Sequence, residues 1–245
     1  PPLSGYALMV VSSPLVFGIV DGLFGGSGQG KVKVDGQVVT KAGQLFSVDV
    51  PILLSDDTPK YVCRAGFKLE KALEVFGFSV QGLTVLDSGL STGGFTDCLL
   101  QHGAQKVFGV DVGYGQVHLK IKQDPRVQVM EQTNLRYVTS VGQLVDLVTL
   151  DLSFISVLKV MDAVKAVLKP DGHLLVLVKP QFEAARHEVG RGGIIKDEAI
   201  HTAVLSNVLA GIESHGFTHL QTTDSPILGA TGNKEFLALF KRVIS

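Results

Sequence analysis

The chain has 245 residues, of which 45% are hydrophobic, 18% are charged and 28 are glycine. This composition excludes an intrinsically disordered chain, a coiled coil and a collagen-like repeat. The 22 basic side chains balance 23 acidic ones, so any RNA binding must come from a local basic face rather than from net charge. Two cysteines, Cys63 and Cys98, are too few for a disulfide framework or a structural zinc site, and we expect no metal.

Residues 6–24 form an apolar stretch that is long enough to raise the question of a membrane span. Pro14, two serines and Asp21 interrupt it, and it has no basic flank that would set a topology or mark a signal peptide. We therefore expect no stable membrane association. Residues 1–30 end in GGSGQG, which is typical of a flexible connection, and they are left unassigned.

A small β portion is predicted over residues 31–58. The alternating runs KVKV and VVTKAG lie on either side of Asp35-Gly36, a strong hairpin signal. The polar sequence SDDTP that follows predicts a linker, so we place the start of the main domain at residue 59 and its end at residue 245.

From Tyr61 onward the sequence alternates between helical and strand patterns. The segment FKLEKALEVFG carries Leu69, Leu73 and Phe76 on one face and predicts a helix that ends at Gly77. Further helices are predicted at about 93–102, 156–167 and 197–215. The predicted strands cover 83–87, 106–111, 126–130, 144–151, 172–179, 219–224 and 235–240.

These strands are near-continuous Val and Leu runs, which predicts a parallel sheet covered by helices on both faces. The loop between the last two strands has no room for a crossover helix, so the last strand should be antiparallel. The predicted fold class is α/β: a doubly wound, mostly parallel sheet of seven strands with an antiparallel last strand. This is the Rossmann-like methyltransferase architecture.

A glycine-rich turn follows the first of these strands, from Asp87 to Thr96, and Asp111 ends the second strand. The spacing of the glycines differs from the dinucleotide fingerprint, and no phosphate-binding Lys-Ser/Thr pair follows. Two acids with glycines and small hydroxyls suit S-adenosylmethionine, whose ammonium and sulfonium groups need carboxylate or carbonyl partners. The alternative is that the glycines only permit tight packing and that Asp111 is a solvated strand end.

Four charged residues should converge at the ligand-binding edge of the sheet. Asp151 ends the fourth strand, Lys179 ends the fifth, Glu235 begins the seventh, and Lys68 lies on the preceding helix. Two lysines and two acids near a methyl donor suit methylation of a poor nucleophile, such as a ribose 2′-hydroxyl, because a desolvated lysine can serve as a base. Taken singly, Lys68 also fits a solvated helix face and Glu235 an edge-strand charge.

Several motifs resemble the TlyA (hemolysin A) family of FtsJ-like RNA methyltransferases. They are RAGFKLEKAL, LDSGLSTGGFTDCLL, VDVGYGQ, DLVTLDLSFIS, LVKPQFEA, VGRGGIIKD and GNKEFLAL. The resemblance runs from about Lys31 to the C-terminus. It implies S-adenosylmethionine-dependent 2′-O-methylation of ribosomal RNA and an N-terminal S4 RNA-binding domain. Residues 31–54 resemble only the C-terminal half of that domain, because the apolar residues 1–28 stand where its basic helices would be.

The resemblance also assigns roles to individual residues. It places a catalytic tetrad on Lys68, Asp151, Lys179 and Glu235, and it selects Lys68 over Lys71. Lys179 would be the base, Lys68 would shape its pKa, and the two acids would orient the reacting groups. Together with the turn described above, it gives as candidate cofactor-binding residues Asp87, Gly89, Ser91, Thr92, Gly93, Gly94 and Asp111.

The predicted RNA-binding face consists of Arg64, Lys68, Arg186, Arg191 and Lys196. Three of these residues belong to the glycine-rich segment RHEVGRGGIIKD, which is expected to order on RNA, although an ordinary exposed loop has the same composition. The expected partner is ribosomal RNA or a ribosomal subunit.

Three other functions compete with this one. They are methylation of a different acceptor, a noncatalytic role in RNA binding or ribosome assembly, and a membrane-active cytolysin, which the older family name suggests. The intact tetrad argues against the second, and a sheet-based core argues against the third. The chain begins with Pro1, as a fragment or a processed form would, so we expect either a bacterial cytoplasm or a chloroplast or mitochondrion.

Overall fold

The computed structural model describes residues 6–9, 32–35, 37–38, 52–55 and 59–243. The chain divides into two compact units, Pro1–Lys60 and Tyr61–Ser245. The GGSGQG connection and most of the polar linker before residue 59 lie outside the described residues. Within the described part of the chain, no helix has the length and apolar character that crossing a membrane requires.

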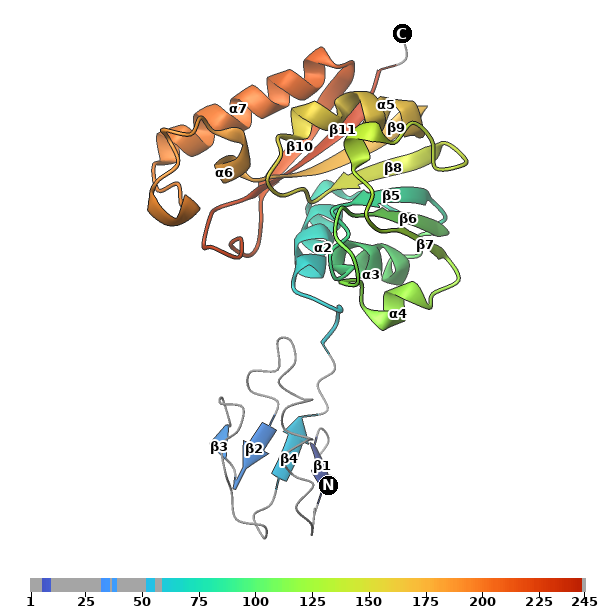
Figure 1. Ribbon diagram of the computed structural model, residues 1–245, viewed down its shortest axis with the longest axis vertical. Coiled ribbons are helices and arrows are strands. Elements are labelled where there is room, and N and C mark those ends of the chain that lie inside the picture. The colour runs from blue at the N-terminus through green and yellow to red at the C-terminus, as the bar shows by residue number, and fades with distance from the viewer. Residues whose placement is uncertain (1–5, 10–31, 36, 39–51, 56–58, 244–245) are drawn as a thin grey trace. The chain divides into compact units, whose positions relative to one another are not determined.

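The first unit contains a four-stranded antiparallel sheet in the order β1-β4-β2-β3 (Figure 1). Its strands are β1 (Tyr6–Met9), β2 (Val32–Val34), β3 (Gln37–Val38) and β4 (Ile52–Ser55). Val34 pairs with Gln37 across a turn in which Asp35 has a φ of 50°, so the predicted hairpin is confirmed. The sequence left residues 1–30 unassigned, whereas the structure places a strand, β1, within them.

The second unit is built around a seven-stranded sheet in the order β10-β11-β9-β8-β5-β6-β7. Strand β11 is antiparallel to both of its neighbours, and the other adjacent pairs are parallel, as predicted. The strands are β5 (Thr84–Ser88), β6 (Lys106–Val110), β7 (Val127–Met130), β8 (Val145–Leu150), β9 (Leu168–Val178), β10 (Phe217–Asp224) and β11 (Phe236–Arg242).

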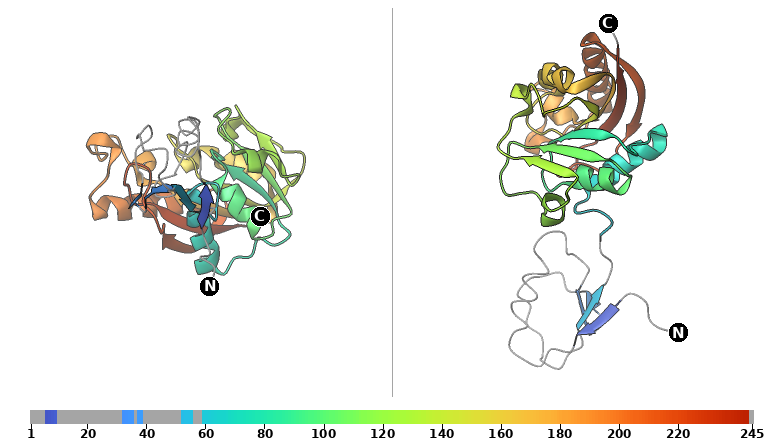
Figure 2. Two further views of the ribbon diagram at one scale, coloured as in Figure 1. Left: turned by 90° about the horizontal axis from the view of Figure 1, so that it is seen from below. Right: turned by 90° about the vertical axis from the view of Figure 1, so that its right-hand side faces the viewer.

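Helices cover both faces of this sheet (Figures 1 and 2). On one face lie α2 (Ala65–Phe76), α3 (Gly94–Gln101) and α4 (Leu119–Lys122), and on the other lie α5 (Met161–Val167) and α7 (Glu198–Ser214). The short α6 (Pro180–Glu183) follows β9. Three 3₁₀ turns complete the unit: η1 (Leu135–Tyr137), η2 (Val157–Val160) and η3 (Arg191–Gly193).

Alternate residues of the central strands feed two separate hydrophobic clusters. In β9, Leu174 and Val176 pack with α5 and α7, whereas Leu175 and Leu177 pack with α2 and α3. Because side chains alternate between the faces of a strand, a strand buried on both faces must be apolar at every position. The continuous Val and Leu runs in the sequence are explained by this packing.

Two elements differ from their predicted bounds by four or more residues, and the others by one or two. The helix predicted at 156–167 starts as the 3₁₀ turn η2 and becomes α-helical only at Met161. Strand β9 starts at Leu168, four residues before its predicted start, because Leu168 already pairs with Val145. The register between β8 and β9 then shifts, because residues 169–172 are left without a strand-pairing partner in β8 before His173 pairs with Leu147.

Candidate active site

A cavity of about 670 Å³, called the larger cavity below, opens at the carboxyl ends of four parallel strands. This volume is typical of a small-molecule site, and the strand order reverses at this point of the sheet. The loops after β5, β6, β7 and β8 each contribute to it. The uncharged polar and acidic lining residues are Ser88, Ser91, Asp111, Gln116, Thr133, Asn134, Asp151 and Ser153, and the basic ones are Arg136 and Lys159.

Asp111 joins two of these loops. Its Oδ2 accepts a hydrogen bond from the Ser91 amide at 2.7 Å, and its Oδ1 accepts one from the Gly113 amide at 2.7 Å. A carboxylate has about four acceptor sites, so each oxygen keeps capacity for a ligand hydroxyl. A ribose diol is therefore a suitable partner for Asp111 in the larger cavity.

The predicted cofactor residues fall into two groups. Gly89, Ser91 and Asp111 line the larger cavity, whereas Asp87, Thr92, Gly93 and Gly94 are not among its lining residues. A side chain at Gly94 would collide with Cys63 and with the Gly66 backbone, so this glycine permits α3 to begin directly against α2. Gly93, with a φ of 100°, likewise packs against Ile121.

Asp87 is fully buried beneath the glycine-rich turn. Its carboxylate accepts hydrogen bonds from the hydroxyls of Thr96, at 2.7 Å, and Thr149, at 2.8 Å. Burial raises the pKa of Asp87 to about 6, although the two threonine hydrogen bonds oppose this shift. In this position Asp87 links the start of α3 to β8.

A second cavity of about 380 Å³, called the smaller cavity below, adjoins the first, because Asp151, Ser153 and Phe154 line both. All four predicted catalytic residues line the smaller cavity, so the structure brings them together. Its full lining is Arg64, Lys68, Asp151, Ser153, Phe154, Lys179, Gln181, Phe182, Gly192, Gly193, Ala230, Thr231 and Glu235.

The four predicted catalytic residues form two ion pairs. Lys68 Nζ lies 2.5 Å from Glu235 Oε2, and both side chains are buried. Lys179 Nζ lies 2.7 Å from Asp151 Oδ1 and donates to Ser153 Oγ at 3.0 Å. A buried charge is tolerated only when it is paired and hydrogen-bonded, and each lysine here has a carboxylate as its partner.

Gly229 makes room for the carboxylate of Glu235. A Cβ atom at this position would lie 2.5 Å from Glu235 Oε1, the oxygen that does not bind Lys68. The Glu235 backbone is held as well, because its carbonyl accepts a hydrogen bond from the Ser225 amide at 2.9 Å. The turn before β11 therefore determines where this carboxylate lies.

Several residues at the boundary of the cavities escaped the sequence analysis. Phe154 is 91% exposed, has a φ of 65°, which is rare for a bulky residue, and contacts Phe182 with ring centroids 5.0 Å apart. Its position in the loop just after β8 was the signal from which the sequence could have predicted it. Polar residues that follow the carboxyl end of a parallel strand tend to line the ligand site. Thr133 and Asn134, which follow β7 and line the larger cavity, could have been predicted in this way.

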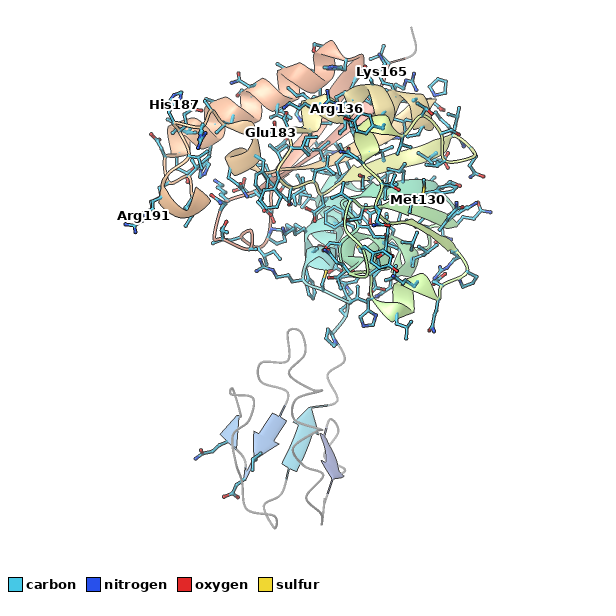
Figure 3. All side chains as sticks on the ribbon, in the orientation of Figure 1. Met130, Arg136, Lys165, Glu183, His187 and Arg191 are labelled. Atoms are coloured by element: carbon cyan, nitrogen blue, oxygen red, sulfur yellow. The ribbon has the colours of Figure 1, made fainter. Side chains whose placement is uncertain are left out.

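The predicted RNA-binding residues are also divided. Arg64 lines the smaller cavity, whereas Arg186, Arg191 and Lys196 are exposed and are not among its lining residues. Figure 3 shows Arg191 pointing away from the body of the unit. These side chains are therefore accessible to a large ligand outside the cavity.

Comparison with known proteins identifies the family. The model of the FtsJ-like methyltransferase family matches residues 61–242, which is the whole second unit apart from its last residues. The chain belongs to the FtsJ-like methyltransferase family. The expected methyltransferase activity with S-adenosylmethionine as cofactor is thereby confirmed, and the carboxylate and backbone groups of the larger cavity fit that cofactor.

Individual relatives agree with this membership. The chain is 44% identical over 184 residues to hemolysin A of Brachyspira hyodysenteriae, covering 74% of this chain and 77% of the relative. It is 39% identical over 212 residues to the 16S/23S rRNA (cytidine-2′-O)-methyltransferase TlyA of Mycobacterium tuberculosis, covering 85% of this chain and 79% of the relative.

Solved structures agree with the fold. A Streptococcus thermophilus protein that carries the name hemolysin superposes with a TM-score of 0.77 at 41% identity, over 88% of this chain and 80% of that one. An S-adenosylmethionine-dependent methyltransferase from Mesorhizobium loti superposes with a TM-score of 0.53 at 18% identity, over 70% of this chain and 96% of that one. The second likeness concerns the fold alone, and it agrees with the predicted Rossmann-like methyltransferase architecture.

Proposed function

We propose that the protein methylates a ribose 2′-hydroxyl of ribosomal RNA. The observation that carries this proposal is the convergence of two lysine–carboxylate pairs on a cavity that shares three residues with the larger cavity. Relatives from Mycobacterium tuberculosis and Campylobacter jejuni, which are 39% and 32% identical, are named rRNA (cytidine-2′-O)-methyltransferases. A ribosomal substrate places the enzyme in a compartment that contains ribosomes.

The larger cavity holds the cofactor in this proposal. Asp111 would accept hydrogen bonds from the ribose hydroxyls of S-adenosylmethionine, and Gly89 and Ser91, which line the same cavity, would lie beside the ligand. When bound, S-adenosylmethionine supplies an electrophilic methyl group attached to a sulfonium. Asp151, which lines both cavities, adds a carboxylate near that positive charge.

The smaller cavity holds the acceptor nucleotide. Lys179 would act as the base in its neutral amine form, so the ammonium that is paired with Asp151 must first release a proton to solvent. The neutral amine would then accept the proton of the 2′-hydroxyl as the oxygen bonds to the methyl carbon, and the electron pair of the broken methyl–sulfur bond would remain on sulfur. Asp151 and Ser153 hold the Lys179 amine in place through contacts of 2.7 and 3.0 Å. The Lys68–Glu235 pair fixes a second charged group on the same cavity, and alignment of the reacting atoms supplies most of the acceleration.

The remaining contacts with RNA are divided between base and backbone. The exposed Phe154, which contacts the half-buried Phe182, offers a stacking surface for an unpaired base. Gln181 Oε1 is buried without a hydrogen-bond partner in the described part of the chain, so it can accept a hydrogen bond. Four cations, Arg64, Arg186, Arg191 and Lys196, bind phosphates. The β2–β3 hairpin belongs, in this proposal, to an S4-like RNA-binding portion within residues 31–58.

The test is transfer of labelled methyl from S-adenosylmethionine to ribosomal RNA and to isolated subunits from cells that lack the enzyme. Nuclease digestion and nucleoside analysis then identify the product. A labelled 2′-O-methylnucleoside is the expected result. A label on a base, or cofactor binding without any transfer, would contradict the proposal, and the second outcome would favour a noncatalytic role in ribosome assembly.

A further inference from the structure

Two loops that are distant in sequence border the smaller cavity from the same side. One is the glycine-rich segment 190–195, in which Gly192 and Gly193 line the cavity with φ values of 77° and 75°. The other is the turn 229–235, which contributes Thr231 and Glu235. In Figure 1 these loops are the segment between α6 and α7 and the connection between β10 and β11.

A single buried amide joins the two loops. Asn233 has no exposed surface, and its Oδ1 accepts a hydrogen bond from the Ile195 amide at 3.0 Å. Its Nδ2 donates to the Gly193 carbonyl at 2.8 Å and to Thr231 Oγ1 at 2.9 Å. Both donors of the side chain and its acceptor are therefore used, and two of the three bonds cross to the glycine-rich segment.

The backbone of Asn233 also shapes the turn that carries Glu235. Its carbonyl accepts a hydrogen bond from the Gly229 amide at 2.8 Å, and Gly229 is the residue against which Glu235 Oε1 lies. Asn233 thus binds segment 190–195 through its side chain. Through its main chain it binds Gly229, against which the predicted catalytic carboxylate of Glu235 lies.

Besides Asn233, the glycine-rich segment is held by the side chain of Ile195, which is buried at its C-terminal end, and by its own backbone. Its internal hydrogen bonds, Gly190 N to Ile194 O and Gly193 N to Gly190 O, close the loop on itself, both at 3.1 Å. Its two positive-φ glycines gain much conformational freedom on release. Removal of the Asn233 side chain would leave the Ile195 amide and the Gly193 carbonyl without their hydrogen-bond partner, which favours release of the segment.

We propose that Asn233 is a positioning residue of the acceptor site. It holds segment 190–195 as the wall against which the acceptor nucleotide rests, and with it the exposed Arg191 that binds RNA. The inference rests on the proposed function. Asn233 does not line either cavity and takes no part in proton transfer, so its effect on the reaction is exerted through the geometry of the two loops.

The test compares Asn233→Ala, Asn233→Asp and Val208→Ala with the wild type. Steady-state methylation of ribosomal RNA gives KM and kcat, calorimetry gives the affinity for S-adenosylmethionine, and trypsin digestion followed by mass spectrometry gives the cleavage rate after Arg191 and Lys196. For Asn233→Ala we expect KM for RNA to rise about tenfold or more, because two to three hydrogen bonds that order the wall are lost. Cleavage in the segment should accelerate similarly, while cofactor affinity stays within about twofold of the wild type.

The two other variants separate positioning from general destabilisation. Asn233→Asp keeps the shape of the side chain but places a carboxylate oxygen opposite the Gly193 carbonyl, so the hydrogen bond between them is lost. We therefore expect this variant to resemble Asn233→Ala. Wild-type behaviour would mean that only the shape of the side chain matters and would overturn the proposal. Val208→Ala opens a cavity in the buried face of α7, away from both loops, and should lower the melting temperature without changing KM or cleavage.

Failure of the proposal can be told apart from failure of the proposed function. If wild-type protein transfers no methyl to RNA, the proposed function fails, and the trypsin comparison still decides whether Asn233 holds the segment. If wild-type protein methylates RNA and Asn233→Ala changes KM and cleavage no more than Val208→Ala does, the positioning role is wrong. Joint loss of cofactor binding and RNA binding would also overturn it. Should Asn233→Ala fold poorly, Thr231→Val removes the hydrogen bond that orients the Asn233 side chain within its own turn and should accelerate trypsin cleavage after Arg191 by a smaller factor. KM is not used for this variant, because Thr231 itself lines the cavity.

Discussion

The two cavities lie side by side but are built in different ways. The larger cavity is formed by loops that directly follow neighbouring parallel strands, and backbone amides tie those loops to Asp111. The smaller cavity depends on side chains that meet across the fold: Lys68 and Glu235 are 167 positions apart, and Ile195 and Asn233 are 38 positions apart. The first cavity follows from the loops that parallel strands bring to one edge of the sheet, whereas the second also needs side-chain contacts between segments far apart in sequence.

Lys179→Ala tests whether the two cavities can be separated functionally, and it should have the largest effect. Loss of a general base typically lowers kcat by about 10²–10⁴-fold, while the larger cavity, which Lys179 does not line, should keep its affinity for S-adenosylmethionine. Methyl transfer to ribosomal RNA and calorimetric cofactor binding measure the two. Parallel loss of both would show that Lys179 is structural and that the cavities are not independent.

Lys68→Ala tests the claim that the smaller cavity depends on a long-range ion pair. It leaves the buried Glu235 carboxylate without a cation, which should lower the free energy of unfolding by about 3–5 kcal/mol. Urea denaturation measures the loss. The double variant Lys68→Met, Glu235→Leu should recover most of the stability without recovering activity; if it is no more stable than Lys68→Ala, the unpaired charge is not the cause.

Asp87→Asn tests the support beneath the larger cavity through its pH dependence. The folded-state pKa of Asp87 is raised to about 6, so its contribution to stability is present at acidic pH and is lost as the pH rises through that value. The stability of Asp87→Asn relative to wild type should therefore increase by about 2–3 kcal/mol between pH 4 and pH 7. Urea denaturation of both proteins across this range measures the change, and a pH-independent difference would contradict the assignment.

Asp111→Asn should affect the larger cavity alone. The substitution removes a charged acceptor from the ribose hydroxyls and turns an amide donor toward one of the two backbone N–H groups that now bind the carboxylate. Affinity for S-adenosylmethionine should fall about tenfold, the value of one charge-assisted hydrogen bond. Binding of RNA in a filter assay serves as the control and should be unchanged.

Gly229→Ala should have the smallest effect and acts on the smaller cavity. The added methyl group meets Glu235 Oε1 and displaces the carboxylate from Lys68 without altering any charge. We expect kcat to fall severalfold, up to about tenfold, with cofactor affinity intact, because a small misplacement of catalytic groups is costly. Wild-type kcat would show that the position of Glu235 is not set by this contact.

The same contrast explains how much the sequence could predict. The seven strands, the antiparallel β11 and the polar residues at strand ends follow from local patterns, and so does the convergence of Asp151 and Lys179. The sequence predicted Asp87 as a cofactor-binding residue because it lies at the end of a strand, but Asp87 does not line the larger cavity. Its hydrogen bonds with Thr96 and Thr149, which bury it, cannot be read from that position alone. The role of Asn233 could not be predicted either, because its partners Ile195 and Gly193 lie in a distant loop and no sequence pattern relates the two segments.

The pairing of Lys68 with Glu235 has a consequence for biosynthesis. The ribosome makes Lys68 early, but its partner arrives only when β11 has been made and has inserted between β9 and β10. A nascent or prematurely terminated chain that ends before Glu235 lacks the carboxylate that neutralises Lys68. Because both members of this ion pair line the smaller cavity, that cavity is complete only after synthesis has passed Glu235.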